Sequence, residues 1–258
     1  MLFPVANTNE EIFDAFETYK GVFIHRPDIY RLGKQVYQDS EEVFAAENLA
    51  PLDEKTMFPT KIASLGGVER QVIQQYIMRP PAVKDPTLLT SVSELIVYTK
   101  DEARRLLAFA KDRYQWSDSL YQDVTNRDEW SLNVARYPFM PDKYGEILFP
   151  AHKDWGMFAI YPFVHGAGLE IHAGPATKWQ WVEIPEDTVF CYAGDIFSKV
   201  TNGVMPSLLH RVSQPTSQTG SRTSIIFYVD PIREMVLPSG EKMGDIIDAK
   251  LRKIGQIK

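Results

Sequence analysis

Two histidines and one carboxylate stand in this sequence at a spacing that could hold a metal ion. His152 and Asp154 are two residues apart, so on an extended strand both side chains would leave the same face. His210 comes much later in the chain, which allows several strands to return and supply a third ligand. Two histidines and one carboxylate are the donor set typical of non-haem Fe(II), which keeps coordination positions open for O2 and a substrate. We therefore predict that these three residues are the metal ligands and the catalytic centre.

An arginine follows the second histidine on a segment with the composition of a buried strand. Residues 222–229 are rich in β-branched and aromatic side chains, and alternation places Arg222, Ser224 and Tyr228 on one face. The opposite face is apolar, so we expect it to be covered. A guanidinium beside a hydroxyl is a good receptor for a carboxylate, and a buried arginine needs an anionic partner. Arg222 and Ser224 therefore indicate a carboxylate-binding site, with a structural ion pair of Arg222 as the alternative.

The order HxD, H and RxS resembles the isopenicillin N synthase-like family of Fe(II)/2-oxoglutarate dioxygenases. Further stretches carry the same resemblance: Val134–Pro138, Gly168–Ile171, Trp181–Pro185, Gly194–Gly203 and Ser207–Val212. The similarity is strong from about residue 130 to residue 231 and weaker over the N-terminal third. One departure is Lys153 within HxD, where the family most often has threonine. The resemblance implies Fe(II), 2-oxoglutarate as cosubstrate and O2, with release of succinate and CO2 as a substrate is hydroxylated or desaturated.

The resemblance also implies roles for individual residues. Arg222 and Ser224 would bind 2-oxoglutarate, and Tyr137, in the Tyr-Pro strand, would contact the cosubstrate or the substrate. The family counterpart of Tyr228 is an aromatic residue that lines the substrate pocket. Strand alternation adds two weaker candidates for the pocket, Asn133 and Phe158. Three further histidines lack a partner at ligand spacing and are not expected to bind metal: His25, His165 and His172.

Two alternatives to a 2-oxoglutarate-dependent enzyme stay open. Isopenicillin N synthase and ACC oxidase keep RxS but do not use 2-oxoglutarate, so RxS alone does not prove its use. A metal-binding sandwich protein without catalytic activity is the other alternative. The leading hypothesis is an oxygenase that acts on a small-molecule metabolite or natural product, whose identity the sequence does not reveal.

The composition limits the partners of the protein. The chain has 258 residues, 44% of them hydrophobic and 24% charged, which is ordinary for a globular protein. A formal charge of −6 shows no basic excess, which argues against nucleic acid or an anionic membrane as the main partner. The single cysteine, Cys191, excludes an internal disulfide. The first residues lack the basic region of a signal peptide, and no apolar run approaches the length of a membrane span. We expect a cytoplasmic protein of undetermined oligomeric state.

The secondary-structure pattern changes after Arg127, from helices to strands. A capping box of Thr8 and Glu11 predicts a first helix, Pro27 opens a second, and a long helical region runs from about Ser93 to Asp123. Eight strands are expected beyond them: 131–137, 147–152, 157–161, 168–172, 180–184, 189–193, 208–213 and 222–229.

This order predicts a mainly β fold with flanking helices. We expect a double-stranded β-helix (jelly-roll) core with helices packed on one face, in a single domain of residues 1–258. Within it, residues 1–125 would be mostly helical, residues 126–235 would form the jelly-roll core with the iron site, and residues 236–258 would hold a C-terminal helix.

Overall fold

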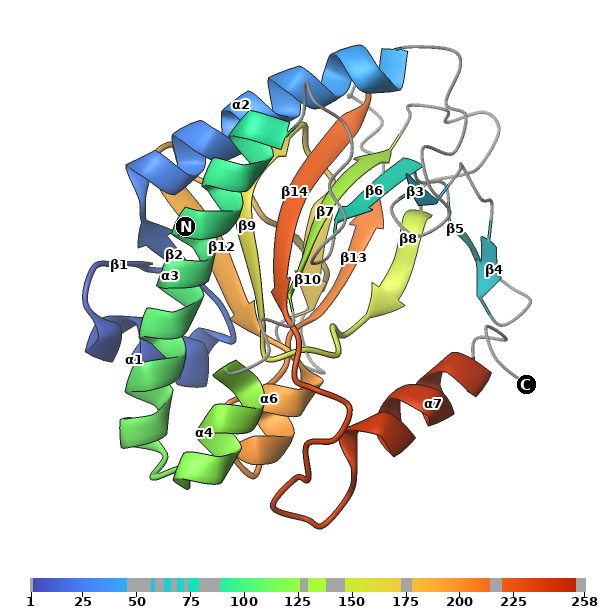
Figure 1. Cartoon of the computed structure of the whole chain (residues 1–258). Coiled ribbons are helices and arrows are strands. Elements are labelled where there is room, and N and C mark those ends of the chain that lie inside the picture. Colours follow the sequence, from blue (N-terminus) through green and yellow to red (C-terminus); the bar gives the residue numbers. More distant parts are fainter. Residues whose placement is uncertain are drawn as a thin grey trace.

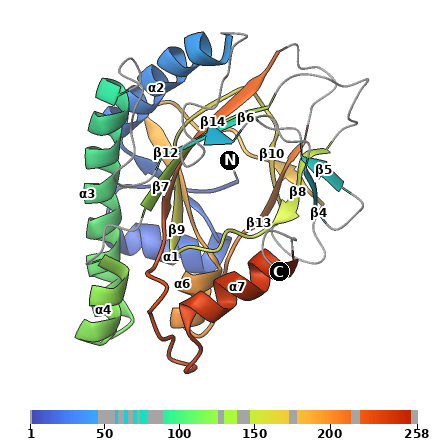
Figure 2. The same ribbon diagram turned by 45° about the vertical axis from the view of Figure 1, so that its right-hand side comes forward.

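Two β-sheets face each other, and helices cover the outer face of the larger sheet (Figure 1). The computed structural model describes residues 2–45, 57–58, 63–65, 69–71, 74–78, 89–125, 130–137, 147–172, 178–213 and 220–253. Within these ranges, every helix is too short or too polar to cross a membrane. The second view shows the smaller sheet opposite the larger one, with the last helix beside its lower end (Figure 2).

The larger sheet has eight strands and the smaller sheet four. The order in the larger sheet is β1 (Val5–Ala6), β2 (Val22–His25), β12 (Thr188–Ala193), β9 (Phe158–His165), β14 (Arg222–Val229), β7 (Trp130–Tyr137), β6 (Gln74–Met78) and β3 (Met57–Phe58). The order in the smaller sheet is β11 (Gln180–Trp181), β10 (Leu169–His172), β13 (Leu209–Ser213) and β8 (Ile147–His152). A separate pair is formed by β4 (Ala63–Leu65) and β5 (Glu69–Gln71). This arrangement confirms the predicted double-stranded β-helix core.

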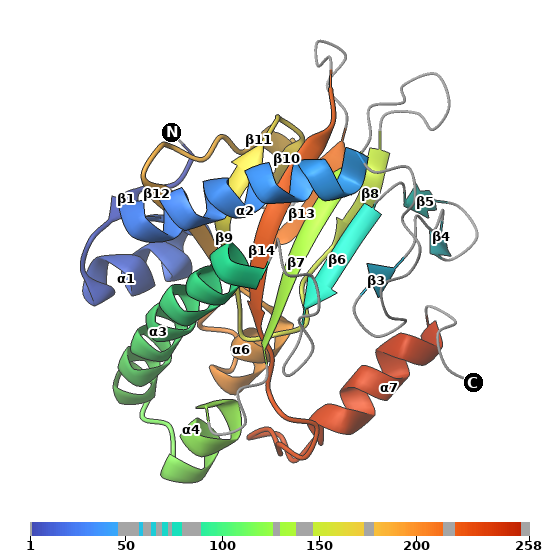
Figure 3. The ribbon, with the colours of Figure 1, turned by 45° about the horizontal axis from the view of Figure 1, so that its top comes forward.

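Strands from the N-terminal part extend the larger sheet at both ends. β2 pairs with β12 on one side. On the other side β6 pairs with β7, and these two strands lie side by side in Figure 3. Backbone hydrogen bonds therefore join the first third of the chain to the jelly-roll core.

The helices differ from the prediction in two places. The observed helices are α1 (Asn9–Tyr19), α2 (Pro27–Ala45), α3 (Leu89–Arg113), α4 (Asp118–Thr125), α6 (Asp195–Val200) and α7 (Met243–Lys253). The long helical region is broken at Gln115, whose φ of 53° is left-handed and turns the chain so that Trp116 packs edge-on against Phe197. α6, which carries Phe197, was not predicted, and its position proves important for the metal centre.

The two faces of the larger sheet belong to different parts of the core. Ile225 and Phe227 of β14 pack in a cluster with apolar residues of α2 and α3, as predicted for this face. The opposite face contributes Tyr161 and Ile226 to a second cluster, which also contains residues of the smaller sheet. The interior between the sheets is therefore closed off from the helices by the larger sheet itself.

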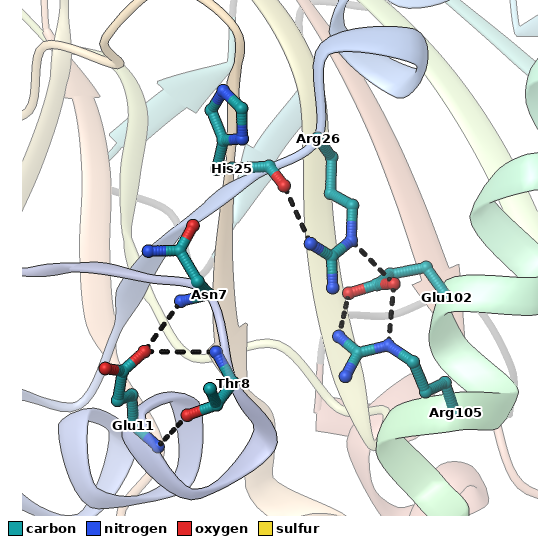
Figure 4. A network of polar contacts seen from close by, with 7 residues as sticks. All are labelled: Asn7, Thr8, Glu11, His25, Arg26, Glu102 and Arg105. Carbon is teal, nitrogen blue, oxygen red and sulfur yellow. Dashed lines mark hydrogen bonds and ion pairs between the residues drawn. The ribbon is translucent and has the colours of Figure 1, made fainter.

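An ion-pair network ties α3 to the end of β2 (Figure 4). The Glu102 side chain is only 6% exposed and accepts hydrogen bonds from Arg26 Nε at 2.8 Å and Arg105 Nε at 3.0 Å. Arg26 also donates to the carbonyl oxygen of His25. Burial raises the pKa of Glu102, but its bonds to Arg105 and Arg26 outweigh burial and leave the pKa below its usual range. Figure 4 also shows the capping box of Thr8 and Glu11 at the start of α1, as predicted.

We expect Glu102→Gln to lower the free energy of unfolding at pH 7 by about 2 kcal/mol, since an amide cannot replace a carboxylate between two guanidinium groups. Because the folded-state pKa of Glu102 is lowered, this stabilisation is present above the unfolded pKa of about 4.3 and is lost as the pH falls through the folded pKa. Urea unfolding at a series of pH values measures the difference, which should shrink in acid.

Asp101→Asn is the matched control on the same helix. Asp101 is 70% exposed and lies 3.6 Å from Arg104, an exposed pair that contributes little to stability. Equal losses for the two variants, or a loss for Glu102→Gln that does not change with pH, would contradict the role given to this network.

Candidate metal centre

The pairing of β8 with β13 brings the two predicted histidine ligands together. His152 and His210 are register partners across these antiparallel strands, and their ring centres lie 4.2 Å apart. Asp154 follows two residues after His152, with carboxylate oxygens 3.5 Å from Nε2 of His152 and 3.9 Å from Nε2 of His210. One ligand atom from each of the three residues falls within a group no wider than 4.8 Å. The three side chains are therefore placed to share one ion.

Backbone carbonyls select the tautomer of both histidines. Nδ1 of His152 lies 2.9 Å from the carbonyl oxygen of Pro150, and Nδ1 of His210 lies 3.2 Å from that of Leu208. A carbonyl oxygen can only accept a hydrogen bond, so each Nδ1 carries the proton. Each Nε2 then presents a lone pair, as a metal-bound histidine requires. Two such nitrogens and a carboxylate fit Fe(II).

α6 holds the backbone around Asp154 in place. The amide of Asp195, at the start of α6, donates to the carbonyl oxygen of Asp154 at 2.8 Å. The next amide in α6, that of Ile196, donates to the carbonyl oxygen of Trp155 at 3.2 Å. A Cβ atom on Gly194 would collide with the carbonyl oxygen of Gly156, so a side chain there would push the two segments apart. The position of Asp154 thus depends on a helix that the sequence pattern did not reveal.

The protonation states at this centre suit a divalent cation. Burial by itself raises the pKa of Asp154, but His210, His152 and a hydrogen bond from Tyr192 outweigh it and lower the pKa to about 2. Burial and the nearby His152 lower the pKa of His210 to about 4. At neutral pH, Asp154 is therefore a carboxylate and His210 a neutral imidazole, which are the states that bind a metal ion.

Tyr192 is a residue of this centre that was not predicted. Its hydroxyl lies 2.6 Å from Oδ2 of Asp154 and 3.2 Å from Nε2 of His210, and the hydroxyl of Tyr161 lies 3.1 Å away. The signal in the sequence is alternation within 188–193, which places Phe190 and Tyr192 together on one face. That face turns to the interior because the other face, with Cys191, packs in the helix-side cluster.

Arg222 is buried without a counter-charge among the residues that the structure describes. It is 1% exposed and pairs in register with Tyr137, whose ring centre lies 5.4 Å from the guanidinium carbon. One guanidinium nitrogen donates to the hydroxyl of Ser224, while Nε and Nη2 have no hydrogen-bond partner among the described residues. Gly168, at φ 129°, allows close passage of the chain, since a Cβ atom there would lie 3.0 Å from Cδ of Arg222. Burial lowers the pKa of Arg222, but a guanidinium stays charged in proteins.

A buried cation with two unpaired donors fits a carboxylate ligand. Leaving such a group unpaired costs several kcal/mol, roughly, because its hydration is lost and not replaced. Tyr137, beside the guanidinium, belongs to a buried apolar cluster with Ala135, Leu148 and Val212. An anion bound here would be shielded from water.

Of the three predicted substrate residues, two lie on the inner face of the larger sheet and one lies on its helix side. Asn133 is 7% exposed on the same face of β7 as Tyr137, and its amide oxygen has no partner among the described residues. Tyr228 is half-buried on the face of β14 that carries Arg222. The expectation for Phe158 was wrong, because this side chain packs against Phe197 at 4.6 Å between ring centres and belongs to the helix-side cluster.

The reason for the error at Phe158 is local. Residues 153–157 form a turn between β8 and β9, so the alternation of His152 and Asp154 does not continue into β9. The inward residues of β9 are Ala159 and Tyr161, which join the interior cluster.

The remaining histidines lie outside the metal centre. His165 ends β9, which extends beyond the predicted strand 157–161, and its ring stacks on that of Tyr37 with 4.6 Å between ring centres. His172 packs edge-on against Trp179, and His25 is an exposed residue at the end of β2. Within the described ranges, His152, Asp154 and His210 are the grouping of three potential ligands that the structure presents.

Comparisons with known proteins agree with this geometry. Residues 129–231 match the 2OG-Fe(II) oxygenase superfamily. The crystal structure of a candidate oxygenase from Shewanella oneidensis superimposes with a TM-score of 0.81, at 18% identity, over 100% of both chains. A Neurospora crassa protein, crystallised in complex with alpha-KG and 5-formyluracil, gives a TM-score of 0.70 at 16% identity, over 95% of this chain and 89% of the other. At these identities the two structures establish the fold alone.

A curated plant enzyme is similar over the core. Gibberellin 3-beta-dioxygenase 1 of Arabidopsis thaliana is 25% identical over 147 residues, which make up 56% of this chain and 39% of the plant enzyme. The match thus spans well under half of the length of that relative.

We expect His152→Ala, Asp154→Ala and His210→Ala each to weaken Fe(II) binding by more than the roughly 10–100-fold that loss of an outer hydrogen-bond partner costs, because each removes a ligand. Anaerobic isothermal titration with Fe(II) measures the affinity. His165→Ala and His172→Ala are the controls, since both remove an imidazole outside the cluster. Unchanged Fe(II) affinity in His210→Ala would overturn the assignment.

Proposed function

We propose that the chain, whose residues 129–231 match the 2OG-Fe(II) oxygenase superfamily, is an oxygenase of this superfamily. It would hydroxylate or desaturate a small-molecule metabolite or natural product, with 2-oxoglutarate as cosubstrate. The observation that carries this proposal is the presence, in one sandwich interior, of a three-residue metal centre and a buried guanidinium that has no anionic partner among the described residues. The first group suits Fe(II), and the second suits a carboxylate.

In this proposal the metal ligands are Nε2 of His152, Nε2 of His210 and the carboxylate of Asp154. When bound, Fe(II) supplies the activation of O2, coupled to oxidative decarboxylation of 2-oxoglutarate to succinate and CO2. The protein holds the three ligands on one side of the site and leaves the other positions open. Apolar residues of the two facing sheets keep bulk water away.

Arg222 and Ser224 would bind the distal carboxylate of 2-oxoglutarate. The guanidinium has two donors without a partner in the described structure, and the Ser224 hydroxyl stands beside it. Tyr137 would support the cosubstrate by covering the guanidinium with its ring. Asn133 and Tyr228 would line the substrate pocket, since both lie on the inner face of the larger sheet.

A small-molecule substrate is supported by net charge and by the relatives. The chain carries a formal charge of −6, without the basic excess that nucleic-acid binding requires. The Neurospora crassa protein was crystallised in complex with both alpha-KG and 5-formyluracil, so a chain of this fold can bind a small molecule together with alpha-KG. We further propose that residues 1–258 act as a single domain, which the strand pairs β2–β12 and β6–β7 support.

Succinate formation tests the proposal against both alternatives. Purified protein with Fe(II), O2 and 2-oxoglutarate should form succinate, and a metabolite library should contain compounds that accelerate it. A 2-oxoglutarate-independent oxidase would consume O2 without succinate. A metal-binding protein without catalytic activity would bind Fe(II) and do neither.

We expect Arg222→Ala to raise the KM for 2-oxoglutarate at least about tenfold, because a desolvated charge pair contributes roughly 2–5 kcal/mol and 1.4 kcal/mol is a factor of ten. Arg222→Lys should recover only part of the lost affinity for 2-oxoglutarate, since an ammonium group cannot make two parallel hydrogen bonds to a carboxylate as a guanidinium does. The anaerobic visible absorption of the protein with Fe(II) and 2-oxoglutarate gives an independent binding curve. Arg211→Ala, which breaks an outward-facing pair with Glu170, is the control and should leave this curve unchanged.

We expect Tyr228→Ala to reduce substrate-coupled turnover while sparing the slow decarboxylation of 2-oxoglutarate without substrate, because Tyr228 would contact only the substrate. Both rates are measured with a thermal melt of the same preparation. A structural tyrosine would behave differently, since truncating a buried aromatic residue costs roughly 3–5 kcal/mol of stability. Equal loss of both rates with a large drop in melting temperature would assign Tyr228 to the core.

A further inference from the structure

We propose that Tyr192 is a positioning residue that restrains the Asp154 carboxylate so that one oxygen is available to the metal ion, and that Tyr161 supports Tyr192. This inference rests on the proposed function only in taking His152, Asp154 and His210 as metal ligands. It assigns Tyr192 and Tyr161 a part that neither the HxD, H and RxS motifs nor the family resemblance contains.

The two oxygens of Asp154 face different partners. Oδ2 accepts a hydrogen bond from the hydroxyl of Tyr192 at 2.6 Å, whereas Oδ1 lies 3.5 Å from Nε2 of His152. A short bond from a phenol to a carboxylate is charge-assisted and stronger than one between neutral groups. Because the phenol occupies Oδ2, Oδ1 is the oxygen left to share a metal ion with His152.

A proton count gives the hydrogen bonds their direction. The hydroxyl of Tyr192 has one proton and three neighbours that could accept it: Oδ2 of Asp154, Nε2 of His210 and the hydroxyl oxygen of Tyr161. Nε2 of His210 no longer accepts once its lone pair binds a metal ion, and of the other two the charged carboxylate at 2.6 Å is the stronger acceptor. The oxygen of Tyr192 then accepts from Tyr161, whose hydroxyl lies 3.1 Å away. The result is a directed chain from Tyr161 through Tyr192 to Asp154.

The surroundings of these hydrogen bonds make the arrangement rigid. Tyr192 and Tyr161 are buried among apolar side chains of both sheets, including Phe190, Leu208 and Ile226. The ring of Tyr192 lies 5.1 Å from that of His210 and 5.7 Å from that of Tyr161. Hydrogen bonds in such an interior are stronger than in water and reinforce one another along a chain. The phenol therefore restrains the carboxylate without being exchanged for water.

The consequence is preorganisation of the metal centre. Without the phenol, both oxygens of Asp154 would be free to approach the ion, and the carboxylate would have to be ordered when the metal binds. Outer hydrogen-bond partners of this kind typically change metal affinity by about 10–100-fold. We expect Tyr192→Phe to lose affinity within this range and Tyr161→Phe to lose less, because it removes only the support.

Anaerobic titrations of the whole 258-residue chain with Fe(II) alone and with Co(II) alone test the inference, together with thermal melts of the metal-free protein. Tyr114→Phe is the matched control, since it also breaks a phenol–carboxylate bond, 2.8 Å to Glu17, but on the helix side of the larger sheet. The expected result is weaker binding of both ions by Tyr192→Phe, with an altered Co(II) visible spectrum, at a melting temperature no lower than that of Tyr114→Phe.

Three results would overturn the inference: equal affinities for Tyr192→Phe and the unchanged protein, an equal loss in Tyr114→Phe, or a phenolate charge-transfer band in the Fe(III) form that disappears in Tyr192→Phe. The last would make Tyr192 a ligand. If Tyr192→Phe fails to fold, Tyr161→Phe decides the question, because an unchanged Fe(II) affinity in that variant would contradict the hydrogen-bond chain from Tyr161 through Tyr192 to Asp154. Failure of the unchanged protein to bind either ion would instead contradict the proposed function, so the two failures are distinguishable.

Discussion

The interior of the sandwich contains a carboxylate and a guanidinium that do not neutralise each other. Asp154 faces two imidazoles and a phenol, while Arg222 faces a hydroxyl and an aromatic ring. Both charges have lost most of their hydration, so each is stable only with a partner of opposite charge. A divalent cation would satisfy the first and a carboxylate the second, so this interior is suited to binding both together.

Backbone pairing, more than side-chain packing, sets the geometry of the metal centre. The β8–β13 ladder places the histidines opposite each other, and amide groups of α6 hold the turn that carries Asp154. Each Nδ1–H group donates to the carbonyl oxygen of the residue two positions earlier in the chain, Pro150 for His152 and Leu208 for His210. The local backbone therefore orients both histidine rings. Errors in strand register would therefore disrupt the site directly, since a shift of one residue turns a side chain to the opposite face.

The larger sheet separates two kinds of packing. Its outer face is covered by α2 and α3, and Glu102 anchors α3 to the end of β2 through Arg26, with Arg105 of the same helix as its second partner. Its inner face carries the polar residues of the proposed site among aromatic rings. The apolar cluster on the helix side thus supplies much of the hydrophobic burial. The inner face can then hold buried polar groups such as Asn133 and Arg222, which cost free energy in a purely apolar core.

The sequence by itself determined the ligand set and the jelly-roll class, because the donor types, the spacing of His152 and Asp154, the series of short strands and the resemblance to a known family agree. Alternation in 222–229 also placed Arg222 and Ser224 on one face, which is the basis for proposing them as a carboxylate receptor. Local rules also predicted α1, whose capping box depends on residues three apart. Only the tertiary structure decided which face each strand turns inward. Phe158 lies on the helix side because a turn interrupts the alternation, and Tyr192 reaches Asp154 because β12 lies beside β9 in the sheet. Such contacts join distant segments, and their partners are set by packing that no local pattern contains.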